Sequence, residues 1–213
     1  MRRRPGFILL LLALDQLWAQ RGEEVWQKLN PFFGGGLTFI DIRFLTTPLF
    51  NNSPDFWGLT LGTNYAYFHT ENEVLAVGPG AQITGSLQFA GGLGTNWMVQ
   101  VPVYGYVRVG AGATAFNVQR LGIGAGAGLQ LTSFQLLYTS LSGNAVGRLR
   151  QTFINPMVFL DLTFNFRRTN PTTIRLNLDI LSSRRNTELL GSIDPVPLEF
   201  RTVGLSFLYK IGL

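Results

Sequence analysis

Residues 171–180 read PTTIRLNLDI, and this stretch decides the fold. Its apolar and polar side chains alternate with a period of two, which is typical of a β-strand with two different faces. One face carries Ile174, Leu176, Leu178 and Ile180, and the other carries Thr173, Arg175, Asn177 and Asp179. In a water-soluble sheet the apolar face covers a core, whereas in a transmembrane barrel it meets lipid and the polar face fills the interior. The direction of the apolar face therefore decides the compartment.

The composition favours lipid on the outside. Charged residues make up only 14% of the 213-residue chain, against about 25% in ordinary soluble domains, so a hydrated surface would lack charges to cover it. The chain has no cysteine, which excludes disulfides, thiolate metal sites, a cysteine nucleophile and a lipid-modified N-terminal cysteine.

The first 19 residues have the layout of a secretory signal peptide. Three arginines at positions 2–4 precede an apolar run from Phe7 to Leu14, and Ala19 offers a cleavage site. The alternative is a retained anchor helix, but an eight-residue apolar run is far shorter than the roughly 20 residues that span a bilayer. Removing residues 1–19 lowers the formal net charge from +5 to +3. A positive charge this small does not indicate nucleic-acid binding.

Period-two alternation dominates the rest of the chain. We expect a short periplasmic segment over residues 20–33, with a short helix at 23–30, and a barrel over residues 34–213. The eight predicted strands span residues 36–46, 56–69, 80–90, 96–115, 120–141, 152–168, 172–183 and 199–212. Residues 131–134 read as a bulge or as a tight turn, and we prefer the bulge because a ninth strand would put the C-terminus at the wrong end. Residues 70–79 form an unusually long second connection.

The aromatic residues separate a transmembrane barrel from a soluble sandwich. Trp57 and Trp97 lie at one predicted level, whereas Tyr65, Tyr67, Phe164, Phe166 and Tyr209 lie near the other. Ten residues at about 3.3 Å each, tilted by about 40°, give about 25 Å, the height of the apolar band of such barrels. Two aromatic girdles at this separation favour a bilayer, so the apolar face of residues 171–180 is expected to meet lipid.

From about residue 34 onwards the chain resembles the small outer-membrane β-barrel proteins of Gram-negative bacteria. The terminal stretch TVGLSFLYKIGL resembles the signal read by the barrel-assembly machinery through Thr202, Gly204, Phe207 and Tyr209, although Leu213 stands where the family has an aromatic residue. A signal peptide ending in Ala-Gln resembles those of Bacteroidota. The resemblance implies an all-β, eight-stranded antiparallel up-and-down transmembrane barrel in the cell outer membrane.

An interior polar network is expected inside this barrel, because eight strands enclose a space that side chains fill. Its predicted members are Asp41, Arg43, Arg108, Asp161, Arg167, Arg175, Asp179 and Lys210. Asp161 is expected about opposite Asp179, with Arg43, Arg108 or Arg175 bridging the two carboxylates. A salt-bridged plug is favoured over a proton or ion relay.

Glycines and alanines on two neighbouring strands predict space for aromatic rings on the inner face and a strip of small residues on the outer face. Gly122, Gly124, Gly126 and Gly128 face inward, opposite Tyr104 and Tyr106, and leave room for those rings. Ala111, Ala113, Ala125 and Ala127 are expected to face outward as a strip where a partner could pack, although sheet curvature is the preferred explanation of the small residues.

The sequence gives catalysis little support. The single histidine, His69, has no serine beside it, and we predict no enzyme activity, no cofactor and no metal site. Predicted loops carry Arg148, Arg150, Arg184 and Arg185, which could pair with lipopolysaccharide phosphates or could simply be solvated. The leading hypothesis is a non-enzymatic envelope or surface-contact barrel, and the second is a barrel subunit of a larger secretion or uptake assembly. Expected partners are outer-membrane lipid, lipopolysaccharide, the barrel-assembly machinery and other outer-membrane proteins.

Overall fold

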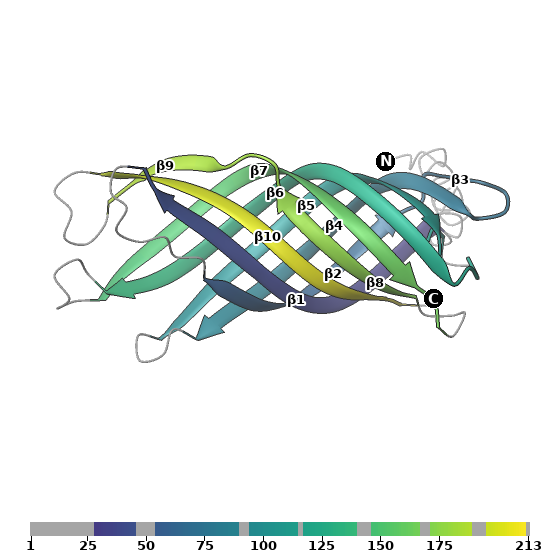
Figure 1. Cartoon of the computed structure of the whole chain (residues 1–213), viewed down its shortest axis with the longest axis horizontal. Helices are drawn as coiled ribbons and strands as arrows, with labels where there is room; N and C mark the ends of the chain where they lie inside the picture. Colours follow the sequence, from purple (N-terminus) through teal and green to yellow (C-terminus); the bar gives the residue numbers. More distant parts are fainter. Residues whose placement is uncertain are drawn as a thin grey trace, which may run out of the picture.

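The computed structural model describes residues 28–45, 54–89, 94–114, 117–139, 146–166, 171–188 and 195–211. These residues form ten antiparallel strands: β1 (Leu29–Phe44), β2 (Asp55–Tyr65), β3 (Phe68–His69), β4 (Leu75–Phe89), β5 (Thr95–Gly110), β6 (Leu121–Thr139), β7 (Val146–Phe164), β8 (Thr172–Asp179), β9 (Ser183–Thr187) and β10 (Val196–Lys210). The wall follows the order β1-β2-β4-β5-β6-β7-β8-β10, and β1 pairs with β10 to close it (Figure 1). The predicted eight-stranded up-and-down barrel is confirmed.

The short strands β3 and β9 extend the wall past breaks in β2 and β8, respectively. β3 pairs with β4 one residue out of step with β2, which makes Ala66 and Tyr67 a β-bulge between β2 and β3. β9 pairs with β10 above β8, and Ile180–Ser182 separate these two strands. β1 begins and β10 ends at the same end of the barrel, here called the terminal end, while β9 lies at the opposite end, called the far end (Figure 1).

The strand registers set the width of the barrel. A circuit of paired residues that starts at Leu162 of β7 passes through Gly35, Leu59 and Gly85 and returns to β7 at Thr152, ten residues away. For eight strands, this shear corresponds to a strand tilt of about 40°. A barrel of this size has an interior that side chains can fill.

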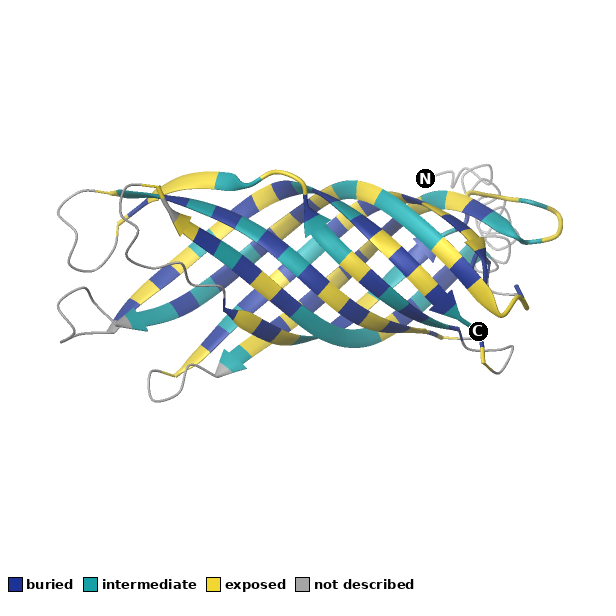
Figure 2. Ribbon diagram, in the orientation of Figure 1, coloured by how far each residue is buried: buried dark blue, intermediate teal, exposed yellow. Residues whose placement is uncertain are grey.

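Burial alternates most regularly along β5 and β10 and over much of the other long strands, and this pattern shows which face of residues 171–180 points inward (Figure 2). Arg175 and Asp179 are each 1% exposed, whereas Leu176 and Ile180 are 46% and 50% exposed. The apolar face therefore points out and the polar face fills the barrel. No helix among the described residues is long and apolar enough to cross a membrane.

The interior is not polar throughout. An apolar cluster fills the far end, here called the far-end cluster, and contains Ile40, Ile42, Phe56, Met98, Phe134, Leu136, Leu149, Phe153, Leu198 and Phe200. Its centre is aromatic, because the rings of Phe153 and Phe200 stack with centroids 5.6 Å apart and Phe134 packs against both. A second cluster at the terminal end includes Tyr104, Tyr106, Met157 and Phe159.

Several predicted strand limits are wrong. β1 begins at Leu29, so residues 29–33, assigned to a periplasmic segment, belong to the barrel, and residues 29–30 are strand where a helix was expected. β6 pairs in unbroken register with β5 and β7, so residues 131–134 are neither a turn nor a bulge. The signal peptide prediction lies outside the described residues.

The second connection is shorter than predicted, because β4 begins at Leu75 and not at Gly80. Gly78 and Pro79 were expected in a turn, yet both lie in β4, paired with Tyr106 and Gly105. The turn is confined to residues 70–74, where the Thr70 amide donates to the Leu75 carbonyl. Much of the predicted loop is therefore barrel wall.

Candidate functional site

Asp161 lies at the centre of the interior polar network. Its neighbour on β8 is Arg175, whose Nε and Nη2 donate to the two carboxylate oxygens at 2.8 and 2.9 Å. Arg108 of β5 donates to the same carboxylate from the opposite side. The Asp161 side chain is fully buried, so its charge is compensated by two guanidinium groups in place of water.

Arg175 reaches across the barrel. Its Nη1 donates to Gln82 of β4 at 2.8 Å and to the hydroxyl of Tyr104 on β5 at 2.9 Å. Its guanidinium carbon lies 4.0 Å from the ring centroid of Phe159, a cation–π contact. One side chain thus ties together β4, β5, β7 and β8.

Asp179 does not share this site, which corrects a prediction. β7 and β8 pair Asp161 with Arg175 and Met157 with Asp179, so the two carboxylates are four residues apart in register. Asp179 accepts hydrogen bonds from neutral groups: Asn155 Nδ2 at 2.9 Å, Gln130 Nε2 at 3.3 Å, and the amide and hydroxyl of Thr202 at 2.8 Å. No arginine side chain bridges the two acids among the described residues.

Lys210 closes the terminal end together with the turn after β5. Its ammonium donates to the carbonyls of Gly112 and Thr114 and to Asn30 Oδ1, and Arg108 Nη1 also donates to the Gly112 carbonyl at 3.2 Å. β5 ends at Gly110, where φ turns positive, so residues 111–114 fold into the barrel mouth. Ala111 and Ala113 are consequently buried, and their predicted place on an outward strip is wrong.

The inward glycines make room for aromatic rings. A Cβ at Gly126 would overlap the ring of Phe159, and a Cβ at Gly80 would overlap the ring of Tyr104. Gly126 pairs with both Tyr106 and Phe159, and Gly128 pairs with Tyr104. The rings can therefore lie across the lumen, as the spacing of glycine and tyrosine predicts.

Asp41 and Arg43 lie on the outer face, so their assignment to the interior is wrong. On β1 the alternate residues Thr38, Ile40 and Ile42 are buried. The interior at this end is apolar, and the charged residues therefore take the outward positions. Arg43 donates to Asp41 at 2.9 Å. Arg167, the last predicted member of the network, lies outside the described residues.

The four arginines assigned to loops lie in strands. Arg148 and Arg150 belong to β7, and Arg184 and Arg185 belong to β9. The guanidinium of Arg150 lies 5.5 Å from the ring centroid of Trp97. All four are exposed, and they lie at the far end.

Five predicted girdle residues lie near strand ends, and Tyr67 and Phe166 lie just outside the strands. Trp57 and Trp97 share one row of paired residues, joined through Leu87 on β4. At the terminal end Tyr209 stacks on Phe33, with centroids 5.8 Å apart, and Phe164 stacks on Phe166 at 6.0 Å. Tyr67 and Phe166 are 76% and 83% exposed, and Tyr65 is half-buried.

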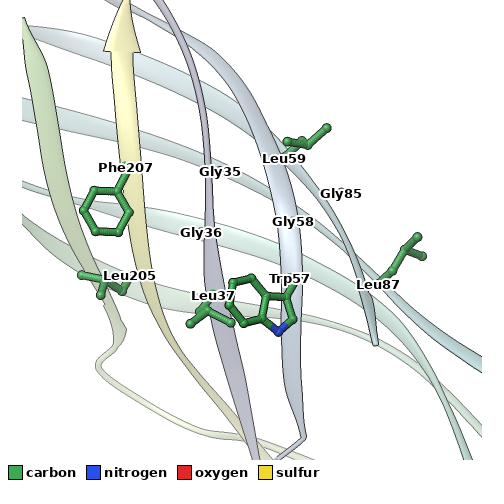
Figure 3. Close-up of a pocket in the computed structure, with 10 residues that line it drawn as sticks. All are labelled: Gly35, Gly36, Leu37, Trp57, Gly58, Leu59, Gly85, Leu87, Leu205 and Phe207. Atoms are coloured by element: carbon green, nitrogen blue, oxygen red, sulfur yellow. The ribbon is translucent and has the colours of Figure 1, made fainter. Parts of the chain in front are cut away.

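Two apolar hollows open on the outer surface over the described strands. One of about 560 Å³ lies over β10, β1, β2 and β4, with Gly35 and Gly85 between larger apolar side chains (Figure 3). The other, of about 620 Å³, lies over β4, β5 and β6 and is lined by Gly105, Ala125 and Ala127.

Sequence reasoning missed the far-end cluster and the neutral partners of Asp179. The signal for Gln130, Asn155 and Thr202 is their inward position in the period-two pattern, but only the strand register shows that they meet one carboxylate. His69 lies in β3, exposed, with its Nδ1 3.3 Å from the Thr70 carbonyl.

The fold is similar to that of solved outer-membrane proteins, although no protein-family model and no curated protein sequence matches the chain. The crystal structure of Neisserial surface protein A (NspA) is similar with a TM-score of 0.50 at 10% identity, over 86% of this chain and 97% of that one. OprG from Pseudomonas aeruginosa gives 0.48 at 12% identity, over 88% and 98%, and Ail from Yersinia pestis gives 0.43 at 10%, over 84% and 97%.

The likeness to NspA is one of fold. That fold, together with the apolar outer surface, places the chain in the outer membrane as a small β-barrel.

Proposed function

We propose that this chain is a non-enzymatic barrel of the outer membrane of a Gram-negative bacterium, whose sealed interior serves envelope integrity or surface contact. The terminal end would face the periplasm and the far end the outside, as in bacterial barrels with an even number of strands. The Ala-Gln sequence at residues 19–20 supports an origin in Bacteroidota.

The filled interior of the barrel is the main support for this function. Arg175 is 1% exposed and spans the lumen between β8 and β4, where it binds Asp161, Gln82 and Tyr104. The far-end cluster lies on one side of this network, and the turn held by Lys210 lies on the other. Three successive layers of packing favour a barrier over a water-filled channel.

The interior acids favour a structural role. A pair of carboxylates could serve as acid and base only if they met at a substrate, but Asp161 is held by two arginines and Asp179 by four donated hydrogen bonds. Both groups are fully engaged in the folded barrel.

Conductance across a planar bilayer tests the seal. The full mature chain, reconstituted alone, should give no stable ion conductance. A triple variant with Phe134, Phe153 and Phe200 changed to Ala should show a higher ion conductance than the wild type. Deleting the gene in its host should raise uptake of hydrophobic dyes, and the wild-type gene should restore the barrier. Steady conductance through the wild-type barrel would refute the proposal.

A second candidate function is that of a subunit in a larger secretion or uptake assembly. The hollow over β4, β5 and β6 supports it, because Ala125 and Ala127 would let a partner approach the wall closely. Mild detergent extraction should then yield a particle heavier than one barrel, and Ala125→Trp should reduce it to the single chain. A lone barrel in both preparations would favour the first function. The barrel-assembly machinery remains an expected partner through the terminal strand.

A further inference from the structure

Arginines gather on the outer face of the far end, over neighbouring strands. Arg148 and Arg150 lie on β7, Arg184 on β9, Arg201 on β10 and Arg43 on β1, and the strand register places each at an outward position. Two acids, Asp41 and Glu199, lie among them as the cross-strand partners of Arg201 and Arg43. This surface, called the arginine face, therefore has a positive excess.

The other strands of the far end differ. The outward residues at the same ends of β2, β5 and β6 are Asp55, Thr95, Trp97, Gln135 and Leu137, and the outward position nearest the end of β4 with a described side chain is Leu87. None of these residues is cationic. The positive charge is thus concentrated on one part of the far end. Solvation alone would not require the arginines to cluster in this way.

A polar hollow of about 150 Å³ opens within the arginine face. Arg43, Arg201, Asp41, Glu199 and Ser182 line it. Asp41 holds the Arg43 guanidinium at 2.9 Å, and Arg201 Nε donates to the Asp179 carbonyl at 2.9 Å. Both arginines keep further N–H groups that no described hydrogen bond uses, and a guanidinium fork matches phosphate oxygens.

An apolar groove over β10, β1, β2 and β4 lies nearer the terminal end and shares β1 and β10 with this polar hollow. Its floor is Gly35 and Gly85, and its walls include Leu37, Trp57, Leu205 and Phe207 (Figure 3). A Cβ at Gly85 would meet nothing within 4 Å, so packing within the chain does not require glycine there. Glycine in a strand costs about 0.5–1 kcal/mol relative to alanine, and here it leaves a depression facing lipid.

The two features are separated by a distance that suits one lipid. Arg201 lies four residues above Leu205 on β10, and Asp41 lies four residues above Leu37 on β1. Four residues span about 13 Å along a strand, or about 10 Å along the membrane normal at a tilt of about 40°. The groove would then lie in the hydrocarbon of the outer leaflet, while the arginines lie at the level of the head groups.

We propose that the arginine face and the groove together form a binding site for one lipopolysaccharide molecule, through its phosphorylated and acylated lipid A. Phosphate groups pair with the guanidinium groups of Arg43, Arg184 and Arg201, and an acyl chain lies along Gly35 and Gly85. The proposal rests on the orientation given under the proposed function. It adds a specific lipid and a specific side of the barrel.

Binding of purified lipopolysaccharide to the full mature chain in phosphatidylcholine nanodiscs tests the site. The groove variant is Gly85→Leu, and its matched control is Gly105→Leu, a second outward glycine whose Cβ would also meet nothing within 4 Å. The charge variant is Arg43→Gln with Arg184→Gln, and its control is Arg120→Gln, an exposed arginine at the terminal end. Retarded migration after heating on a denaturing gel verifies that each variant is folded.

We expect the double charge variant to weaken lipopolysaccharide binding about tenfold and Gly85→Leu about fivefold, while both controls bind as the wild type does. Equal binding by the wild type and all variants would overturn the site. Equal retention of phosphatidylglycerol would also overturn it, because any anionic lipid would then suffice. Ion conductance is measured separately, so a leaky barrel would refute the sealed interior without affecting this result.

Discussion

Asp161 shows how one residue organises the interior. Burying a lone carboxylate costs several kcal/mol, and the chain offsets this cost with two arginines that would be equally unfavourable alone. Because Arg108 also holds the Gly112 carbonyl, the same carboxylate orders the turn that covers the terminal end. A single charge therefore positions side chains from three strands and one connection.

Replacing Asp161 should be far more damaging than replacing Asp179. Asp161→Asn leaves two buried guanidinium groups without a counter-charge, and we expect a loss of about 3–5 kcal/mol in the free energy of unfolding. Asp179→Asn keeps most of its hydrogen bonds to neutral donors and should cost about 1–2 kcal/mol. Urea unfolding of the barrel in phospholipid vesicles measures both, and equal losses would contradict the assigned roles.

The glycines of β6 and β5 should respond oppositely to the same substitution. Gly126→Ala forces the Phe159 ring to move and should cost about 1–3 kcal/mol, whereas Gly105→Ala adds a methyl group in open space and should stabilise by up to about 1 kcal/mol. The same unfolding assay ranks the two variants. A neutral Gly126→Ala would mean that the ring has other room.

The closing pair of strands is the element on which the barrel depends. Leu37 of β1 and Leu205 of β10 are directly opposite each other, and opposite residues bring their Cα atoms within disulfide range. The chain has no native cysteine, so an introduced pair can be read without interference.

Oxidation of Leu37→Cys with Leu205→Cys should therefore give an internal disulfide in the folded barrel. The control is Leu37→Cys with Leu160→Cys, since β1 and β7 are not neighbours in the wall. Alkylation with a mass tag before and after reduction counts the free thiols. Free thiols in the first variant would mean that the sheet is open between β1 and β10.

The success of sequence reasoning differed between elements for physical reasons. In β5, β7, β8 and β10 the inner face is polar over much of its length, so alternation identifies both faces. In β1 the inner residues Ile40 and Ile42 are apolar, and the period-two rule cannot tell an apolar interior from lipid. The register of β7 against β8 depends on the connection between them, which alternation does not encode. Arg108 and Arg175 were correctly expected to pair with Asp161, but Asp179 was for that reason wrongly expected opposite it.

At the scale of the whole molecule, the outer surface should report the depth of each residue in the membrane. Leu61 is 60% exposed and lies four residues below Trp57, about 10 Å along the membrane normal, which is near the middle of an apolar band about 25 Å tall. Thr95 is exposed at the far end of β5.

Arginine substitutions at these two positions should differ accordingly. Leu61→Arg should cost about 2–4 kcal/mol in folding into vesicles, and Thr95→Arg should cost about 0–1 kcal/mol. Reversible urea titration in lipid vesicles measures both free energies. Equal, small costs would mean that this surface meets water, and every face assignment would then be reversed.

The pairing of β1 with β10 also bears on how a cell can recognise an unfinished copy. The two strands are far apart in the sequence, and every residue from Phe32 to Phe44 pairs across this seam, so the seam cannot form until β10 has been translated and exported. A copy truncated before β10 would keep two free sheet edges, whose unpaired amides and carbonyls are costly in lipid. Such a copy should stall on its way to the membrane and become a substrate for periplasmic proteases.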